Sequence, residues 1–266
     1  MRACSLPGYR FAVIILALLS AVGFARADDG RENCDLSVGW EPWKPYQYRP
    51  SDDELTGLDV ELVRAVTEQM GCMIHYQQMP WQRTLFEIEQ GGLVNMAAGA
   101  DKLPERVDYA YFSEPYRSET VYLFIRSDDA GEYDLERLAD IPRRGFRLGI
   151  TAGYHYGERF DELMEKPAFA AQVETVRADQ QNLEKLLLGR IDGFLADPVA
   201  TAALLRGTDH ANRITSHPMT IKQEQIHVMF SRAAHSPGIV SRFNEALQEL
   251  REQGRVQAIM DRYLDY

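Results

Sequence analysis

Three carboxylates of the chain could take part in chemistry: Glu41, Asp101 and Asp197. Two such acids facing one cleft could serve as general acid and general base. The sequence has no G-x-S-x-G, no H-E-x-x-H and no Cys–His arrangement, the motifs that would assign them a reaction. Paired carboxylates are also common in sites that only bind a ligand, so the acids alone do not indicate an enzyme.

Arg106 stands in ADKLPERVDYAYFSEPY, residues 100–116, just before a segment rich in aromatic residues and proline. Most arginines lie in solvent, so its ordinary interpretation is a surface residue paired with Glu105 or Asp108. What a permanent positive charge does at this point depends on the fold and on the compartment of the protein.

The elements that must position these residues alternate between strand and helix. Short apolar segments predict strands, and helical spacing with polar starts or glycine ends predicts helices between them. We expect strands at 34–40, 72–78, 93–99, 146–153, 174–178, 191–197 and 225–231. We expect helices at 56–71, 81–92, 154–166, 179–189 and 236–254. This alternation predicts an α/β fold with parallel sheets built from right-handed βαβ units.

Several side chains follow these strands directly, where open α/β sheets bind their ligands. Trp43 and Tyr46 follow the first strand, and Trp81 and Arg83 follow the second. An aromatic wall there would bury a ligand and attract a cation, although both tryptophans could instead pack in the core. Asp197 ends a buried strand, where it needs a partner or could cap the helix that begins at Pro198.

Cysteines are few and suit an oxidising compartment. Cys34 and Cys72 start consecutive predicted strands, so they could form a disulfide at one sheet edge or remain separate thiols. No C-x-x-C and no clustered His/Cys spacing occurs, so we expect no metal site.

The N-terminus predicts export. Arg2 and Arg10 precede an apolar run at 11–24, and Ala-Arg-Ala follows at 25–27, as in a cleaved signal peptide. The alternative is an uncleaved anchor, for which the run is short. Without the leader's three arginines, 26 basic residues face 40 acidic ones, a net charge of −14. Such a surface argues against nucleic acid or anionic lipid as partner, and 239 remaining residues suffice for two domains.

Taken in order, four segments carry a resemblance: LSVGWEPWKPYQY…TGLDVELVRAV, PERVDYAYFSEPY, LGITAG and LLLGRIDGFLAD. The chain resembles the periplasmic solute-binding proteins of polar amino-acid ABC importers, extracellular family 3, from about residue 35 to 264. The resemblance implies a two-lobed clamshell after a signal peptide at 1–27. Lobe 1 would comprise 28–122 plus 226–266, lobe 2 would comprise 123–225, and two hinge strands would lie at their borders.

The resemblance also implies roles for individual residues. Arg106 matches the arginine that grips the ligand's carboxylate, and Asp197 matches the acid that holds its ammonium. Trp43 matches a position that stacks on ligand side chains, while Gly99 and Gly153 match glycines of the binding loops. The chain departs from the family pattern at two of these positions: Asp101 stands for a threonine and Tyr154 for a hydroxyl residue.

The function implied is capture of a small polar solute, an amino acid or related amine, in the periplasm. Closed protein would deliver the ligand to the membrane permease of an ABC importer, as a monomer and without a cofactor. Two alternatives share the fold: an enzyme resembling the cyclohexadienyl dehydratases, and a sensor that presents its ligand to a receptor.

Overall fold

A computed structural model describes residue 1 and residues 34–51, 54–133 and 135–264. Apart from its first residue, the predicted signal peptide lies outside these residues. The described strands form one mixed sheet in the order β2-β1-β3-β9-β5-β8-β6-β7, with β4 paired to β9. The strands are β1 Asp35–Trp40, β2 Met73–Gln78, β3 Met96–Asp101, β4 Ala110–Phe112, β5 Arg117–Arg126, β6 Leu148–Thr151, β7 Val173–Val176, β8 Gly193–Ala196 and β9 Ile214–Ser231.

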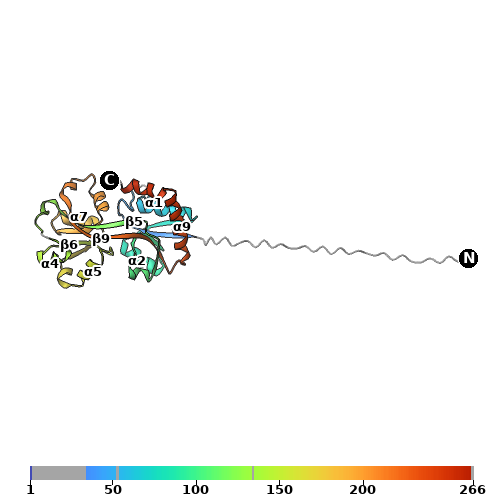
Figure 1. The fold of residues 1–266 in the computed structure, drawn as a ribbon, viewed down its shortest axis with the longest axis horizontal. Coiled ribbons are helices and arrows are strands. Elements are labelled where there is room, and N and C mark those ends of the chain that lie inside the picture. The colour runs from blue at the N-terminus through green and yellow to red at the C-terminus, as the bar shows by residue number, and fades with distance from the viewer. Residues whose placement is uncertain (2–33, 52–53, 134, 265–266) are drawn as a thin grey trace. The chain divides into compact units, whose positions relative to one another are not determined.

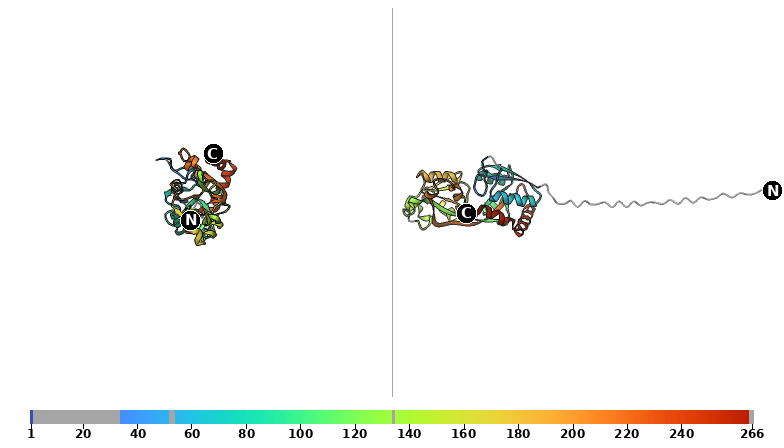
Figure 2. Two further views of the ribbon diagram at one scale, coloured as in Figure 1. Left: turned by 90° about the vertical axis from the view of Figure 1, so that its left-hand side faces the viewer. Right: turned by 90° about the horizontal axis from the view of Figure 1, so that it is seen from above.

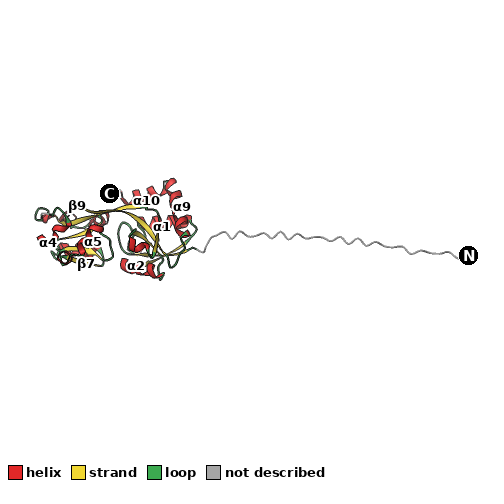
Figure 3. Ribbon diagram, turned by 60° about the horizontal axis from the view of Figure 1, so that its bottom comes forward, coloured by secondary structure: helices red, strands yellow, loops and turns green. Residues whose placement is uncertain are grey.

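Helices flank the strands of both halves of the sheet, as Figure 3 shows by colour. They are α1 Leu58–Gln69, α2 Trp81–Gln90, α3 Pro104–Val107, α4 Ile141–Arg144, α5 Glu158–Met164, α6 Pro167–Ala170, α7 Asp179–Leu187, α8 Pro198–Leu205, α9 Gly238–Glu252 and α10 Arg255–Leu264. In α1 the apolar stripe predicted by helical spacing, with Leu62, Val63 and Val66, is buried against the first half of the sheet.

Each half of the sheet has a parallel core. β1 runs parallel to β2 and β3 in one half, and β6 runs parallel to β7 and β8 in the other. Separate clusters of buried side chains fill the two halves, one around Leu36, Phe230 and Phe243 and another around Leu123 and Phe146. The predicted strand–helix alternation is therefore confirmed in both halves.

Two long strands join the halves. β5 and β9 pair with each other antiparallel; β9 also pairs with β3 and β4 of the first lobe, and β5 pairs with β8 of the second. Figures 1 and 2 show both strands passing from one lobe to the other. The predicted clamshell with two hinge strands is confirmed, but β9 has 18 residues where the sequence predicted seven. The exact lobe borders, 122/123 and 225/226, fall inside these strands and stay a prediction.

The predicted helix at 154–166 begins four residues late. α5 starts at Glu158, and the loop before it ends at Gly157. Gly157 has a φ of 93°, a backbone conformation that residues with a side chain rarely adopt and that is not helical. That loop carries Tyr154, whose position is described below. The predicted disulfide is confirmed: Cys34 and Cys72 are bonded, with a Cα–Cα distance of 4.7 Å. Among the described helices, none has the length and apolar composition to cross a membrane.

Candidate functional site

A cavity of about 550 Å³, counting the part open to solvent, lies where residues of both lobes meet. Seven of the ten residues predicted to bind ligand line it: Trp43, Trp81, Gly99, Asp101, Arg106, Tyr154 and Asp197. The strand ends and the loops after them therefore converge as the parallel topology predicts. The other three predicted residues, Tyr46, Arg83 and Gly153, are not part of its lining.

Arg106 lies in the one-turn helix α3 and is only 5% exposed. Its Nη1 donates to the main-chain oxygen of Asp101 at 3.3 Å, and its Nη2 donates to that of Gly153 at 3.1 Å. No carboxylate oxygen of the described residues lies within 4.0 Å of its guanidinium. Burial lowers the pKa of Arg106, and the Asp101 carboxylate opposes that change. The alternative of a surface arginine paired with Glu105 or Asp108 is wrong.

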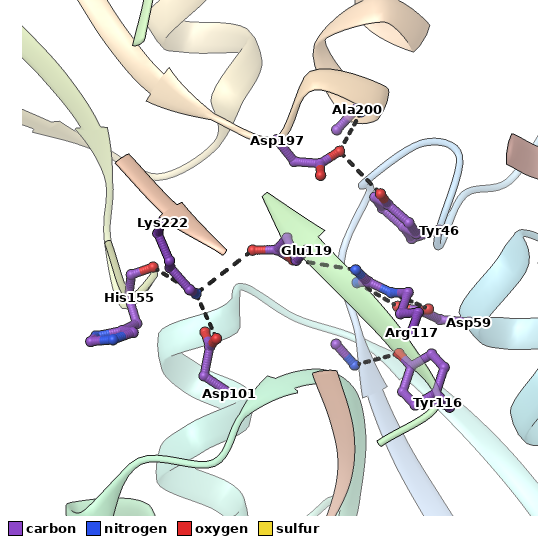
Figure 4. A network of polar contacts seen from close by, with 11 residues as sticks. Tyr46, Asp59, Asp101, Tyr116, Arg117, Glu119, His155, Asp197, Ala200 and Lys222 are labelled. Carbon is purple, nitrogen blue, oxygen red and sulfur yellow. Dashed lines mark hydrogen bonds and ion pairs between the residues drawn. The ribbon is translucent and has the colours of Figure 1, made fainter. Parts of the chain in front are cut away.

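Asp197 ends β8 and caps α8. Its Oδ1 accepts hydrogen bonds from the Ala200 amide at 2.7 Å and from the Tyr46 hydroxyl at 3.0 Å (Figure 4). The capping alternative is thus confirmed, with Pro198 in the first turn. Burial raises the pKa of Asp197, and no lysine, arginine or histidine nitrogen of the described residues lies within 4.0 Å of its carboxylate. A ligand role for this residue stays a prediction.

Asp101 does not turn its carboxylate toward Arg106. Its Oδ1 lies 2.5 Å from the Nζ of Lys222, a residue of β9 that the sequence did not single out. Lys222 also donates to the main-chain oxygen of His155 at 3.1 Å and lies 3.9 Å from Glu119 (Figure 4). The family's threonine position therefore holds an acid that the protein neutralises itself.

Behind this pair lies a second buried ion cluster. Arg117 of β5 donates from Nε and Nη2 to the two carboxylate oxygens of Asp59, at 3.1 and 3.4 Å. Its Nη1 lies 3.4 Å from Glu119, which lines the cavity. Burial raises the pKa of Glu119 to about 7, although Arg117 and Lys222 both lower it. Glu119 links the two clusters, because each of its oxygens faces a different cation (Figure 4).

Aromatic rings form one wall of the cavity. The ring centroids of Trp43 and Tyr46 are 4.4 Å apart, and those of Trp43 and Tyr154 are 6.0 Å apart. The buried indole N–H of Trp43 has no acceptor among the described residues. Gly99 has a φ of 78°, and a Cβ there would lie 3.3 Å from the Trp43 ring. Glycine thus lets the ring approach the end of β3. Tyr46 packs behind Trp43 and is 2% exposed.

Tyr154 closes the cavity from the second lobe. Its hydroxyl donates to Glu41 of the first lobe at 2.8 Å, and the other oxygen of Glu41 accepts the Trp81 amide at 2.8 Å. Burial raises the pKa of Glu41, while these two hydrogen bonds lower it. Next to Tyr154, Gly153 packs on α2, where a Cβ would lie 2.9 Å from the Gln82 side chain. Tyr154, which stands where the family has a smaller hydroxyl residue, therefore connects the second lobe to Glu41 of the first lobe.

Arg83 points elsewhere. Its side chain is 54% exposed on α2 and forms an ion pair with Glu87 in the next turn. It also lies 4.9 Å from the Phe86 ring. Its predicted ligand role gains no support from this position. The described residues contain no group of three or more His, Cys, Asp or Glu that could hold a metal ion.

Two proteins of similar sequence and one solved structure of similar fold resemble this chain. The chain is 21% identical to the probable amino-acid-binding protein YxeM of Bacillus subtilis, covering 94% of this chain and 92% of that protein. It is 22% identical to the L-cystine-binding protein TcyJ of Escherichia coli K12, covering 95% and 92%. A solved histidine kinase sensor domain with similarity to periplasmic binding proteins superposes with a TM-score of 0.76, at 20% identity over 88% of this chain and 98% of that one.

The family model of the bacterial extracellular solute-binding proteins, family 3, matches residues 36–266. That range includes every residue of the cavity and both hinge strands. The match extends over most of the chain and agrees with the two-lobed fold, so the chain belongs to the bacterial extracellular solute-binding proteins, family 3.

Proposed function

We propose that the protein binds an α-amino acid with a cationic side chain between its lobes. The observation that carries this proposal is the pair of buried, opposite charges without an ionic partner among the residues that the structure describes. Arg106 of the first lobe and Asp197 of the second both line the cavity, and neither has an oppositely charged group of the described residues within 4.0 Å. An α-carboxylate for Arg106 and an α-ammonium for Asp197 would complete both.

The charge of the site supports the cationic side chain. The acids and cations that line the cavity or belong to the ion pairs of Arg117 and Lys222 behind it are five acids and three cations: Glu41, Asp59, Asp101, Glu119, Asp197, Arg106, Arg117 and Lys222. Fully ionised, they leave two negative charges in excess, and protonation of Glu119 would still leave one. A neutral zwitterion does not offset that excess, whereas a further ammonium or guanidinium group does.

Glu41 is the group best placed to receive this further charge. It is half-buried, has no cation of the described residues within 4.0 Å, and shares the cavity lining with Trp43, Trp81 and Tyr154. Aromatic faces next to a carboxylate suit a desolvated ammonium or guanidinium group. The free indole N–H of Trp43 could donate to an oxygen of the ligand.

Closure of the lobes would follow from such a bridge. A ligand that contacts both Arg106 and Asp197 binds the closed form better than the open one and shifts the population toward it. A difference of about 5 kcal/mol between the two forms is enough for a nearly complete shift. The closed form is then what a permease of an ABC importer would receive.

The names of the relatives support the amino-acid class of the ligand and not its side-chain charge, since YxeM is a probable amino-acid-binding protein and TcyJ an L-cystine-binding protein. We place the mature protein in the periplasm after cleavage of the leader, as a monomer that needs no nucleic acid, cofactor or catalytic residue. Residues 28–122 plus 226–266 would form the lobe that carries Arg106, and residues 123–225 the lobe that carries Asp197.

Calorimetry on ligand-stripped protein tests the proposal with L-lysine, L-arginine, L-glutamine and L-glutamate. L-Lysine or L-arginine should bind at least about tenfold more tightly than L-glutamine, and L-glutamate more weakly still. Solution scattering should show compaction with the same ligands. Binding without a preference for cations would contradict the ligand class, and conversion of any of the four compounds to a product would contradict a pure binding role.

Asp197→Asn separates the two roles of Asp197. Asparagine is as good an N-cap as aspartate, so α8 should keep its cap and the melting temperature should change little. The negative charge is gone, so the affinity for L-lysine should fall by at least about 30-fold. An unchanged affinity would show that Asp197 only caps the helix.

A further inference from the structure

Lys222 lies behind the cavity wall, and its side chain is 1% exposed. Its ammonium faces acceptors from three parts of the fold. These are the Asp101 carboxylate at the end of β3, 2.5 Å away, the His155 carbonyl after β6, 3.1 Å away, and Glu119 of β5, 3.9 Å away. Figure 4 shows the three converging on Lys222. The first two accept hydrogen bonds from Lys222, and Glu119 adds an ionic contact.

Asp101 contacts two cations in two different ways. Its carboxylate accepts from Lys222, while its main-chain oxygen accepts from Nη1 of Arg106 at 3.3 Å. The carboxylate is also the charge that influences the pKa of Arg106 most. The direction in which this carboxylate turns therefore decides whether Arg106 is neutralised from within the protein.

We propose that Lys222 is a specificity-determining residue. By holding the Asp101 carboxylate, it leaves the charge of Arg106 for the carboxylate of the ligand. This inference rests on the proposed function, because it concerns the same cavity. Without Lys222, Asp101 would be a buried carboxylate without its cation, which is strongly unfavourable. Arg106, five residues along the chain and already bonded to the main-chain oxygen of Asp101, would then be an alternative partner.

A purely structural role makes a different prediction. The pair also ties β9 to the end of β3, so its loss could lower stability without touching ligand choice. The two roles are separated by a ratio of affinities, which a loss of stability alone does not change. The appropriate probes are L-lysine and 1,5-diaminopentane, because the second is the first without its carboxylate.

The experiment measures both affinities by calorimetry for the wild type and Lys222→Met. The wild type should prefer L-lysine by at least about 30-fold, since a buried charge pair is made only with the carboxylate. In Lys222→Met, Asp101 turns to Arg106, and the preference should shrink at least about tenfold. Asp101→Thr/Lys222→Met removes the competing carboxylate as well and should restore most of the preference.

Lys102→Met is the matched control, because Lys102 adjoins Asp101 in sequence but is exposed. Its preference should equal that of the wild type. If Lys222→Met does not fold, Lys222→Gln gives the same comparison: its amide can donate to Asp101 or the His155 carbonyl while the charge is absent.

One result overturns the inference alone: an unchanged preference in folded Lys222→Met. Equal binding of both probes by the wild type, or its failure to bind either probe, contradicts the proposed function and this inference together. The two failures are therefore distinguishable in one experiment.

Discussion

Arg106 and Arg117 are eleven residues apart, and both are buried, 5% and 6% exposed. Arg117 forms a two-bond ion pair with Asp59, and its guanidinium lies 4.0 Å from the Tyr46 ring. Arg106 has two carbonyl oxygens instead. Two arginines with nearly the same burial therefore differ in their partners. The charge of Arg117 is neutralised inside the fold, whereas the charge of Arg106 is held in place and still available to a ligand.

The largest effect should come from the neutralised arginine. Arg117→Met leaves Asp59, which is 0% exposed, as a buried carboxylate without its cation. We expect the free energy of unfolding to fall by about 3–5 kcal/mol. Arg106→Met removes a donor from two carbonyls only and should cost about 1–2 kcal/mol. Urea unfolding of ligand-free protein, followed by circular dichroism, measures both.

A double variant controls for lost packing. Arg117→Met/Asp59→Leu removes both charges together, and replacement of a buried pair by apolar residues is often close to neutral. It should therefore be more stable than Arg117→Met alone. Equal losses in Arg106→Met and Arg117→Met would remove the distinction between the two arginines.

Ligand binding should reverse the ranking of the two variants. Arg106→Met should weaken L-lysine binding by about 2–4 kcal/mol, roughly 30- to 1,000-fold, because it removes the group proposed to receive the carboxylate. Arg117 is not part of the cavity lining, so folded Arg117→Met should lose less affinity. Calorimetry at a temperature where both variants are folded provides the comparison, and a greater loss in Arg117→Met would contradict it.

Much of the fold could be predicted because its signals are local. Helical spacing marked α1, and short apolar segments between glycine turns marked β3, β6 and β8. The length of β9 could not be predicted, because ITSHPMTIKQEQ is mostly polar and exposed on alternate positions. Its strand conformation depends on pairing with β5, a partner about 100 residues earlier in the chain.

The residues of the site also divide into those that the sequence could predict and those that it could not. Arg106 and Asp197 follow strand ends, so topology and family resemblance together placed them at the cavity. Glu119 and Lys222 were missed because RSET and IKQEQ have polar residues on both faces, and no periodicity marks the buried ones. Lys222 pairs with Asp101 across 121 residues, a tertiary contact, whereas Glu119 pairs with Arg117 two residues away on the same strand. Neither residue lies inside a strand expected from the sequence, since Lys222 precedes the strand expected at 225–231, so no local signal marked them.

Glu119 connects the two arginine environments and should make stability depend on pH. Its pKa is about 7 in the folded protein against an ordinary 4.5, so between these values the folded form binds more protons than the unfolded form. Stability should therefore fall as the pH rises from about 4.5 to 7, by on the order of 1–3 kcal/mol. Asp179, with a pKa also about 7, contributes with the same sign.

Glu119→Gln isolates the contribution of Glu119. The amide stays neutral at every pH, so the variant should lose part of the decline between pH 5 and 7.5 that urea unfolding shows for the wild type. Asp179→Asn should remove a separate part. A pH dependence identical in wild type and Glu119→Gln would mean that Arg117 and Lys222 keep Glu119 ionised throughout this range.

The smallest effect on ligand affinity should come from a third arginine. Arg83 was predicted to bind ligand, yet its side chain is 54% exposed and pairs with Glu87, whose side chain is only 4% exposed. Arg83→Met would leave Glu87 as a buried carboxylate without this cation, so the free energy of unfolding should fall by about 1–3 kcal/mol. The affinity for L-lysine should change by less than about 0.5 kcal/mol, because Arg83 is not part of the cavity lining. Because Trp81 and Gln82 contact Gly153 from the same helix, a large loss of affinity would mean that α2 moves on closure and brings Arg83 to the ligand. In that case neither the exposure of an arginine nor its pairing with a carboxylate in this structure would separate the arginines that bind ligand from those that do not.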